Sequence, residues 1–143
     1  MPDPLVVTRR IAAPPARVYL YLTESDLWAV WQGVEANLEA SPGGDLSLRM
    51  PGGQIARGQF VELEPATRVV FSWGWVGHPD VPPASTTVEI ELTPDGDGTL
   101  LTLTHTGLPP SEMKMHRLGW EHYLPRLATA SQGGDPGPDN GAG

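Results

Sequence analysis

The chain has no cysteine among its 143 residues. Disulfide frameworks, thiolate metal sites and cysteine nucleophiles are therefore excluded, and the absence fits the reducing cytoplasm, where we expect the protein to be. Basic residues are also few: 9 Lys and Arg stand against 17 Asp and Glu, for a net charge of −8. Such a surface would be repelled by a phosphate backbone or an anionic bilayer. We expect neither nucleic-acid binding nor constitutive membrane binding.

Long apolar runs and the usual catalytic patterns are missing as well. No stretch approaches the roughly 18 apolar residues of a membrane span, and MPDPLVVTRR lacks the apolar segment of a secretory signal. There is no H-E-x-x-H, no acidic calcium loop, no phosphate-binding glycine loop and no G-x-S-x-G. His116 and His122 cannot form a metal pair, because six residues separate them widely around a helix. The sequence predicts no metal site and no cofactor.

What the chain does contain is alternation of apolar and polar residues, which is typical of strands. The expected strands are 5–11, 34–40, 45–50, 54–64, 68–76, 86–93 and 99–106, divided by turns rich in Pro and Gly. Helical spacing marks 14–23, continued by the short turn SDLWAVW, and 111–130. Pro125 lies inside the second helix and should kink or restart it. Short connections favour an antiparallel meander.

These elements predict one α+β domain over residues 1–130, with an antiparallel sheet covered by the C-terminal helix. A strongly curved sheet around one helix does not always close tightly, so a cavity would form between them. Residues 131–143, SQGGDPGPDNGAG, are rich in Gly and Pro. We expect them to be a disordered tail.

A row of aromatic residues raises the main functional question. In FSWGWVG, Phe71, Trp73 and Trp75 share one face of a strand. They either fill a solid core or line a hollow, and the sequence leaves both possibilities open. The row runs toward the Pro-rich loop 77–85, which suggests a pocket wall near an entrance.

Two more tryptophans lie on the first helical segment. Trp28 and Trp31 are candidates for the rim of such a pocket, with anchoring of the helical hairpin to the sheet as the alternative. On the C-terminal helix, His116 and Trp120 lie on the stripe that should face the sheet, and Tyr123 could reach the same space.

His105 is the best polar candidate, because it shares a strand face with Leu101 and Leu103. A lone histidine there is more often satisfied by a backbone or hydroxyl partner. In an open cavity it could instead hold a ligand carbonyl or act as a general acid or base. In that case His116 or Tyr123 would be its partner in moving protons. The full set of candidate ligand-binding residues is Trp28, Trp31, Phe60, Phe71, Trp73, Trp75, His105, His116, Trp120 and Tyr123.

Three segments in order resemble a known family: IAAPPARVYLYLTESDLWAVW (11–31), ARGQFVELEPATRVVFSW (56–73), and TTVEIELTPDGDGTLLTLTHTGLP (86–109) with LGWEHYLPRLA (118–128). They are similar to homologues of the activator of the ninety-kilodalton heat-shock chaperone's ATPase, within the START-like, polyketide cyclase-like SRPBCC superfamily. The resemblance covers about residues 5–130. It implies a helix-grip fold, a curved seven-stranded antiparallel sheet around a long C-terminal helix with two short helices closing one end, and an internal hydrophobic cavity.

This superfamily has many functions, so the fold does not fix the activity. The first interpretation is a non-enzymatic binder of a small hydrophobic ligand that is lipid-, sterol- or polyketide-like. The second is a cyclase or dehydratase that uses His105 on a polyketide-like or aromatic substrate. The third is a chaperone-interacting protein. The cavity could also be filled by tryptophan side chains, and two chains could pair as a homodimer through exposed apolar faces.

Overall fold

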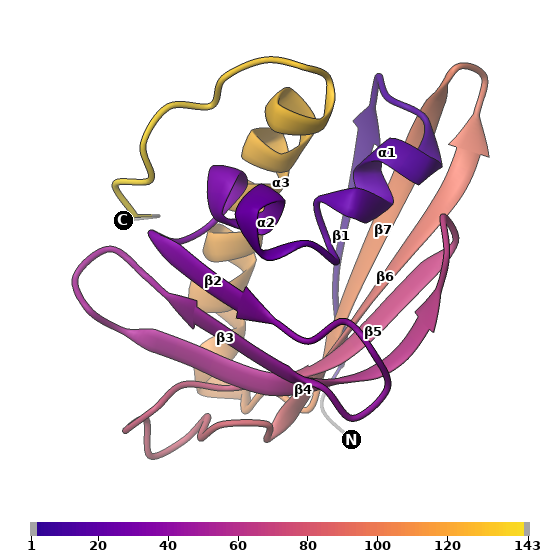
Figure 1. The fold of residues 1–143 in the computed structure, drawn as a ribbon. Coiled ribbons are helices and arrows are strands. Elements are labelled where there is room, and N and C mark those ends of the chain that lie inside the picture. The colour runs from indigo at the N-terminus through magenta and orange to yellow at the C-terminus, as the bar shows by residue number, and fades with distance from the viewer. Residues whose placement is uncertain (1–2, 142–143) are drawn as a thin grey trace.

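The computed structural model describes residues 3–141 and confirms the α+β helix-grip fold. Seven antiparallel strands form one sheet in the order β1-β7-β6-β5-β4-β3-β2, which curves around the C-terminal helix (Figure 1). The strands are β1 Leu5–Ile11, β2 Glu35–Leu38, β3 Asp45–Arg49, β4 Ile55–Glu64, β5 Arg68–Trp73, β6 Thr86–Asp95 and β7 Gly98–Thr106. The helices are α1 Pro15–Leu20, α2 Ser25–Trp31 and α3 Met113–Ser131, which follows the short 3₁₀ turn η1 Pro110–Glu112.

The two-residue period of the sequence places one face of each strand in the core. On β6, Val88 and Ile90 are fully buried while Glu89 and Glu91 lie on the outer face, at least partly exposed. The sheet is continuous because every strand except β1 and β2 pairs on both sides. A register shift between Phe60 and Glu62 marks a bulge in β4, which increases the local twist of the sheet.

Helix α3 covers the concave face with the stripe that its spacing predicts. Trp120, Leu124 and Leu127 are buried against the sheet and the N-terminal helices. The helix does not restart at Pro125, which lies inside a single continuous helix. No helix among residues 3–141 is long and apolar enough to cross a membrane.

Helices α1 and α2 close one end of the fold. Pro15 starts α1 at a position where its missing N–H costs no hydrogen bond. Trp28 and Trp31 on α2 are both fully buried, with their rings stacked at a centroid distance of 5.1 Å. Trp28 also meets the edge of Phe71 on β5 at 5.6 Å. These two tryptophans therefore anchor the hairpin to the sheet, which was the alternative to their role as a pocket rim.

Strand β5 ends three residues earlier than its sequence pattern predicts, at Trp73 instead of residue 76. Gly74 explains the difference, because a Cβ at this position would overlap the carbonyl oxygen of Pro82 in the following loop. The loop folds back onto the strand end, and the Trp75 N–H donates to Val81 O at 2.8 Å. Loop 77–85 is thus held beside the open end of the sheet.

The C-terminal segment, for which the composition predicts disorder, is placed against the domain. Residues 134–141 form no helix or strand, yet they turn back past α3 toward α2 (Figure 1). The guanidinium of Arg126 donates to Pro136 O and Gly137 O, both at 2.8 Å. Asp139 accepts hydrogen bonds from the Gly33 N–H and the Tyr123 hydroxyl.

Substitution of Gly74 by Ala tests the close approach of the loop. The added methyl group would push Pro82 away, so we expect the free energy of unfolding in urea to fall by about 1–3 kcal/mol. Gly119→Ala is the matched control, since a Cβ there meets no atom within 4 Å. It should raise the stability by roughly 0.5–1 kcal/mol, because alanine favours the helix. Equal effects of the two changes would contradict this explanation.

Candidate functional site

A hollow lies between the end of β5, loop 77–85 and α3. It has a volume of about 640 Å³. Its apolar lining consists of Met50, Pro51, Trp73, Trp75, Val76, Pro79, Met115 and Trp120, and its polar lining includes Gln32, Gln54, His78, Glu112, His116 and Tyr123. Val76 and Met115 are half or more exposed, at 50% and 67%, so the mouth opens between the loop and the start of α3.

The structure brings half of the predicted ligand-binding residues to this cavity. Trp73, Trp75, His116, Trp120 and Tyr123 line it. Trp73 is central, with Trp120 at 5.3 Å and Trp75 at 5.4 Å between ring centroids. The aromatic row therefore does both things that the sequence left open: its outer part lines a hollow and its inner part fills a core.

The other five predicted residues lie in the core and do not line the cavity. Phe60 and Phe71 pack edge to face at 6.3 Å, and Phe71 lies between Trp28 and Trp73. They support the wall from behind. His105 is also fully buried and outside the lining. Trp28 and Trp31 complete this group, and both are fully buried in the core and outside the cavity lining.

Sequence reasoning missed the polar residues at the mouth. The His78 Nδ1 accepts the N–H groups of Asp80 and Val81, which leaves the proton on Nε2. That Nε2 lies 3.4 Å from Glu112 Oε1, so loop and helix meet across the entrance. His78 lies three residues after Trp75, in a loop already expected at the entrance, and this position is the signal that could have found it.

His105 is held in one tautomer by a buried relay of hydrogen bonds. The Thr86 hydroxyl donates its only proton to Trp73 O at 2.7 Å. Towards His105 Nε2, at 2.8 Å, this hydroxyl can therefore only accept, and Nε2 must carry the ring proton. The opposite nitrogen, Nδ1, accepts from Trp120 Nε1 at 3.1 Å. Both ring nitrogens are occupied, and the imidazole is neutral.

This environment lowers the pKa of His105 to about 3, first through burial and second through the neighbouring His116. A second proton on Nδ1 would also face the Trp120 N–H. The residue has no open side toward the cavity, so the geometry argues against its use as a general acid or base.

His116 lines the cavity but is similarly committed. Its Nε2 accepts from Trp75 Nε1 at 3.1 Å, so Nδ1 carries the proton and donates to Glu112 O at 2.9 Å. Burial lowers the pKa of this imidazole, a shift that Glu112 partly opposes. The ring thus serves to fix Trp75 and the start of α3.

Three hydrogen-bond donors belong to residues that line the cavity, and two of them have no partner among the described residues. Trp73 Nε1 is buried and has no hydrogen-bond partner among the residues that the structure describes. Gln32 Oε1 accepts from Trp28 Nε1, which leaves the amide NH₂ as the free end of a side chain that lines the cavity. The third donor is the Tyr123 hydroxyl, which donates to Asp139 Oδ1 at 3.2 Å. Burial raises the pKa of this hydroxyl well above the usual range, so it stays protonated. Beside the Glu112 carboxylate at the mouth, the cavity therefore offers donors within an apolar wall.

Comparison with known proteins identifies the fold's family. The family model described as "Activator of Hsp90 ATPase homolog 1-like protein" (AHSA1) matches residues 12–132. The chain belongs to the AHSA1-like family. No curated protein was found to be significantly similar to it.

Solved structures agree with this membership. An AHSA1-like protein from Rhizobium etli is 46% identical over 96% of this chain and 88% of its own, with a TM-score of 0.72. CalU16 from Micromonospora echinospora is 28% identical over 91% of this chain and 76% of its own, with a TM-score of 0.75. DynU16, described as a protein in the dynemicin biosynthetic locus, is 26% identical with a TM-score of 0.81; the match covers 98% of this chain and 51% of DynU16.

Residues 3–141 contain no group of three or more His, Cys, Asp or Glu side chains that could hold a metal ion. His78, Glu112 and His116 lie near one another at the cavity mouth. However, His78 Nδ1 already accepts the N–H groups of Asp80 and Val81. His116 Nε2 likewise accepts from Trp75 Nε1.

The low pKa of His105 predicts acid sensitivity. The unfolded chain takes up a proton near pH 6.5 that the folded protein accepts only near pH 3. Stability should therefore fall as the pH drops from 6.5, by up to about 1.4 kcal/mol per pH unit from this group. His105→Gln keeps a donor and an acceptor but does not titrate. It should cost about 1–3 kcal/mol at pH 7 and give a shallower decline between pH 6.5 and 4 in urea denaturation. Parallel curves for the two proteins would refute the assignment.

Proposed function

We propose that this AHSA1-like domain binds a small, mainly apolar ligand in the cavity between β5 and α3. The observation that carries the proposal is an unfilled volume of about 640 Å³ lined by three tryptophans. Ligand pockets commonly enclose about 300–1,000 Å³, with apolar walls and a few polar groups. A core filled by tryptophan alone would leave no such volume.

The lining favours a ligand that contains rings. Trp73, Trp75 and Trp120 approach one another at tilted or edge-on angles, so each offers part of a ring face or edge to the cavity. Aromatic contacts of this kind add about 0.5–1.5 kcal/mol per pair beyond the burial of area. The unpaired Trp73 N–H would gain a partner from a ligand oxygen.

A polyketide-like ligand is consistent with the relatives. DynU16, a protein in the dynemicin biosynthetic locus, shares the fold and is 26% identical to this chain over a match that covers 51% of DynU16. We take this as support for ring-containing polyketides as a first class to test, beside lipids and sterols. We also propose that the protein lies in the cytoplasm, because its lack of cysteine fits a reducing compartment.

Binding without catalysis is the better supported of the alternatives. A cyclase or dehydratase would need an acid or base that touches the substrate, and His105 is sealed behind Thr86 and Trp120. The contact with a chaperone that the family's description suggests would use an outer surface, and no surface feature described above favours it.

The experiment is a ligand panel read by tryptophan fluorescence and thermal melting. The panel contains medium-chain fatty acids, sterols and aromatic polyketides. Three of the five tryptophans line the cavity, so a true ligand should quench or shift the emission and raise the melting temperature. A panel that changes neither signal would end the proposal.

A cavity-filling substitution checks the location. Gly119 lies on α3 and lines the cavity, and a Cβ there meets no atom within 4 Å. Gly119→Leu should therefore extend into the cavity and weaken binding of a panel ligand by about tenfold or more, which corresponds to about 1.4 kcal/mol. Glu121→Leu adds the same side chain at an exposed position of α3 and should leave affinity unchanged. Equal affinities in both variants would place the ligand elsewhere.

A further inference from the structure

The end of the C-terminal segment occupies the edge of the cavity. Asp139 Oδ2 accepts the Gly33 N–H at 2.7 Å, and its Oδ1 accepts the Tyr123 hydroxyl at 3.2 Å. Tyr123 lines the cavity, as does Gly141, two residues beyond Asp139. One carboxylate of the chain itself is therefore bound beside the space in which we propose that a ligand lies.

The two donors belong to the rigid part of the domain. Gly33 has a φ of +83°, and a Cβ there would lie 3.0 Å from Arg49 O, so the backbone is fixed in a conformation that favours glycine. Tyr123 is only 4% exposed on α3. Both N–H and O–H groups are thus set in place by the fold and converge on one acceptor.

The acceptor, in contrast, lies on a segment that is weakly held. Residues 134–141 have no helix or strand and are rich in Gly and Pro, which disfavours intrinsic order. The remaining hydrogen bonds that fix this segment to the domain are those of Arg126 to the carbonyl oxygens of Pro136 and Gly137 and that of the Gly134 N–H to Thr129 O at 2.9 Å. Figure 1 shows the segment as an open strap beside α2 and α3.

A cation lies beside this site without a carboxylate partner. Arg126 donates to three carbonyl oxygens, those of Trp31, Pro136 and Gly137. Its guanidinium makes no ion pair with any acidic group in residues 3–141. Displacement of the strap would remove two of the three carbonyl partners of Arg126 and free the N–H groups that bind them. An arginine with free N–H groups readily pairs with a carboxylate.

We propose that the Gly33 N–H and the Tyr123 hydroxyl form a carboxylate-binding site at the edge of the cavity. Asp139 occupies this site in the free protein, and the carboxylate of an apolar acid takes its place when the strap is displaced and the Arg126 guanidinium becomes free to pair with that carboxylate. This inference rests on the proposed binding function and deepens it. The ligand has an apolar ring or chain in the cavity and an anionic end at the strap. Asp139 is then an internal competitor that lowers the affinity for such acids.

Two probes that differ at one end test the site. 2-Naphthaleneacetate carries a carboxylate, and 2-naphthaleneethanol has the same rings with a neutral hydroxyl. Asp139→Ala removes the competitor, so the acid should bind about five- to tenfold more tightly while the alcohol changes by less than about twofold. Tyr123→Phe in the Asp139→Ala background should reverse most of the gain for the acid.

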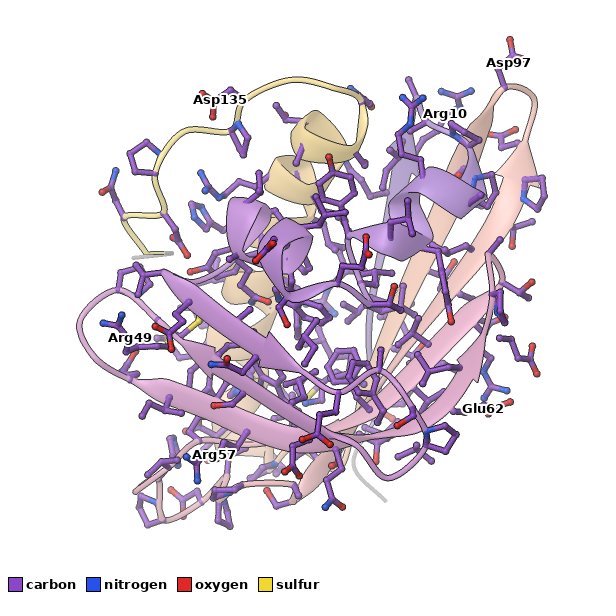
Figure 2. The ribbon with its side chains drawn as sticks, in the orientation of Figure 1. Arg10, Arg49, Arg57, Glu62, Asp97 and Asp135 are labelled. Atoms are coloured by element: carbon purple, nitrogen blue, oxygen red, sulfur yellow. The ribbon has the colours of Figure 1, made fainter. Side chains whose placement is uncertain are left out.

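Asp135→Ala is the charge-matched control. Asp135 lies on the same strap and points away from the domain (Figure 2), and its carboxylate accepts only the nearby Gly137 N–H. This variant removes one negative charge without opening the site, so both affinities should stay within about twofold of the original. An equal gain for the acid in both variants would reduce the effect to net charge and overturn the proposal.

Further outcomes separate this proposal from the binding function. Equal gains for acid and alcohol in Asp139→Ala would make the strap a steric cover only and would refute the carboxylate site. Binding of other panel ligands with no binding of the acid would refute it as well, while the cavity's function stands. As a second measurement, the Gly33 amide resonance of Asp139→Ala should shift on addition of the acid and not of the alcohol; an unmoved resonance contradicts the proposal.

Discussion

A buried relay of hydrogen bonds joins four elements of this domain and sets the distance between its two layers. It runs from Trp73 O on β5 through Thr86 on β6 and His105 on β7 to Trp120 on α3. Every donor and acceptor in the relay is used, so a buried polar group that would otherwise cost stability is fully satisfied. Because the relay fixes α3 above the sheet at this point, the space beside it remains open and becomes the cavity.

The same relay explains why the most conspicuous candidate for chemistry serves structure. The period of β7 places His105 on the inner face, as its sequence pattern predicts. Whether an inner face meets a cavity or a neighbouring side chain depends on elements far apart in the sequence. The partners of His105 come from residues 86 and 120, and no local pattern indicates that both would reach it.

Local pattern predicted most of the fold, since alternation and turn residues specify strands wherever one face is buried. Local pattern gave wrong predictions where contacts between elements far apart in the sequence determine a strand end or the place of a side chain. The strand end at Gly74 depends on the Pro82 carbonyl, and the place of Trp28 and Trp31 depends on Phe71. Composition predicts disorder for the C-terminal segment, and this stays a prediction. Composition cannot reveal that Arg126 and Tyr123 offer hydrogen-bond partners to the segment.

The stacked pair Trp28–Trp31 has a consequence for how this domain can be observed. The two indoles lie at 5.1 Å with an angle of 30° between their planes, within the closed end of the fold and outside the cavity lining. Rings so close couple their electronic transitions, and this coupling depends on the distance and angle between the two rings. The molecule thus carries two separate groups of tryptophans. Trp28 and Trp31 report on the packing of the closed end. Trp73, Trp75 and Trp120 report on the cavity that they line.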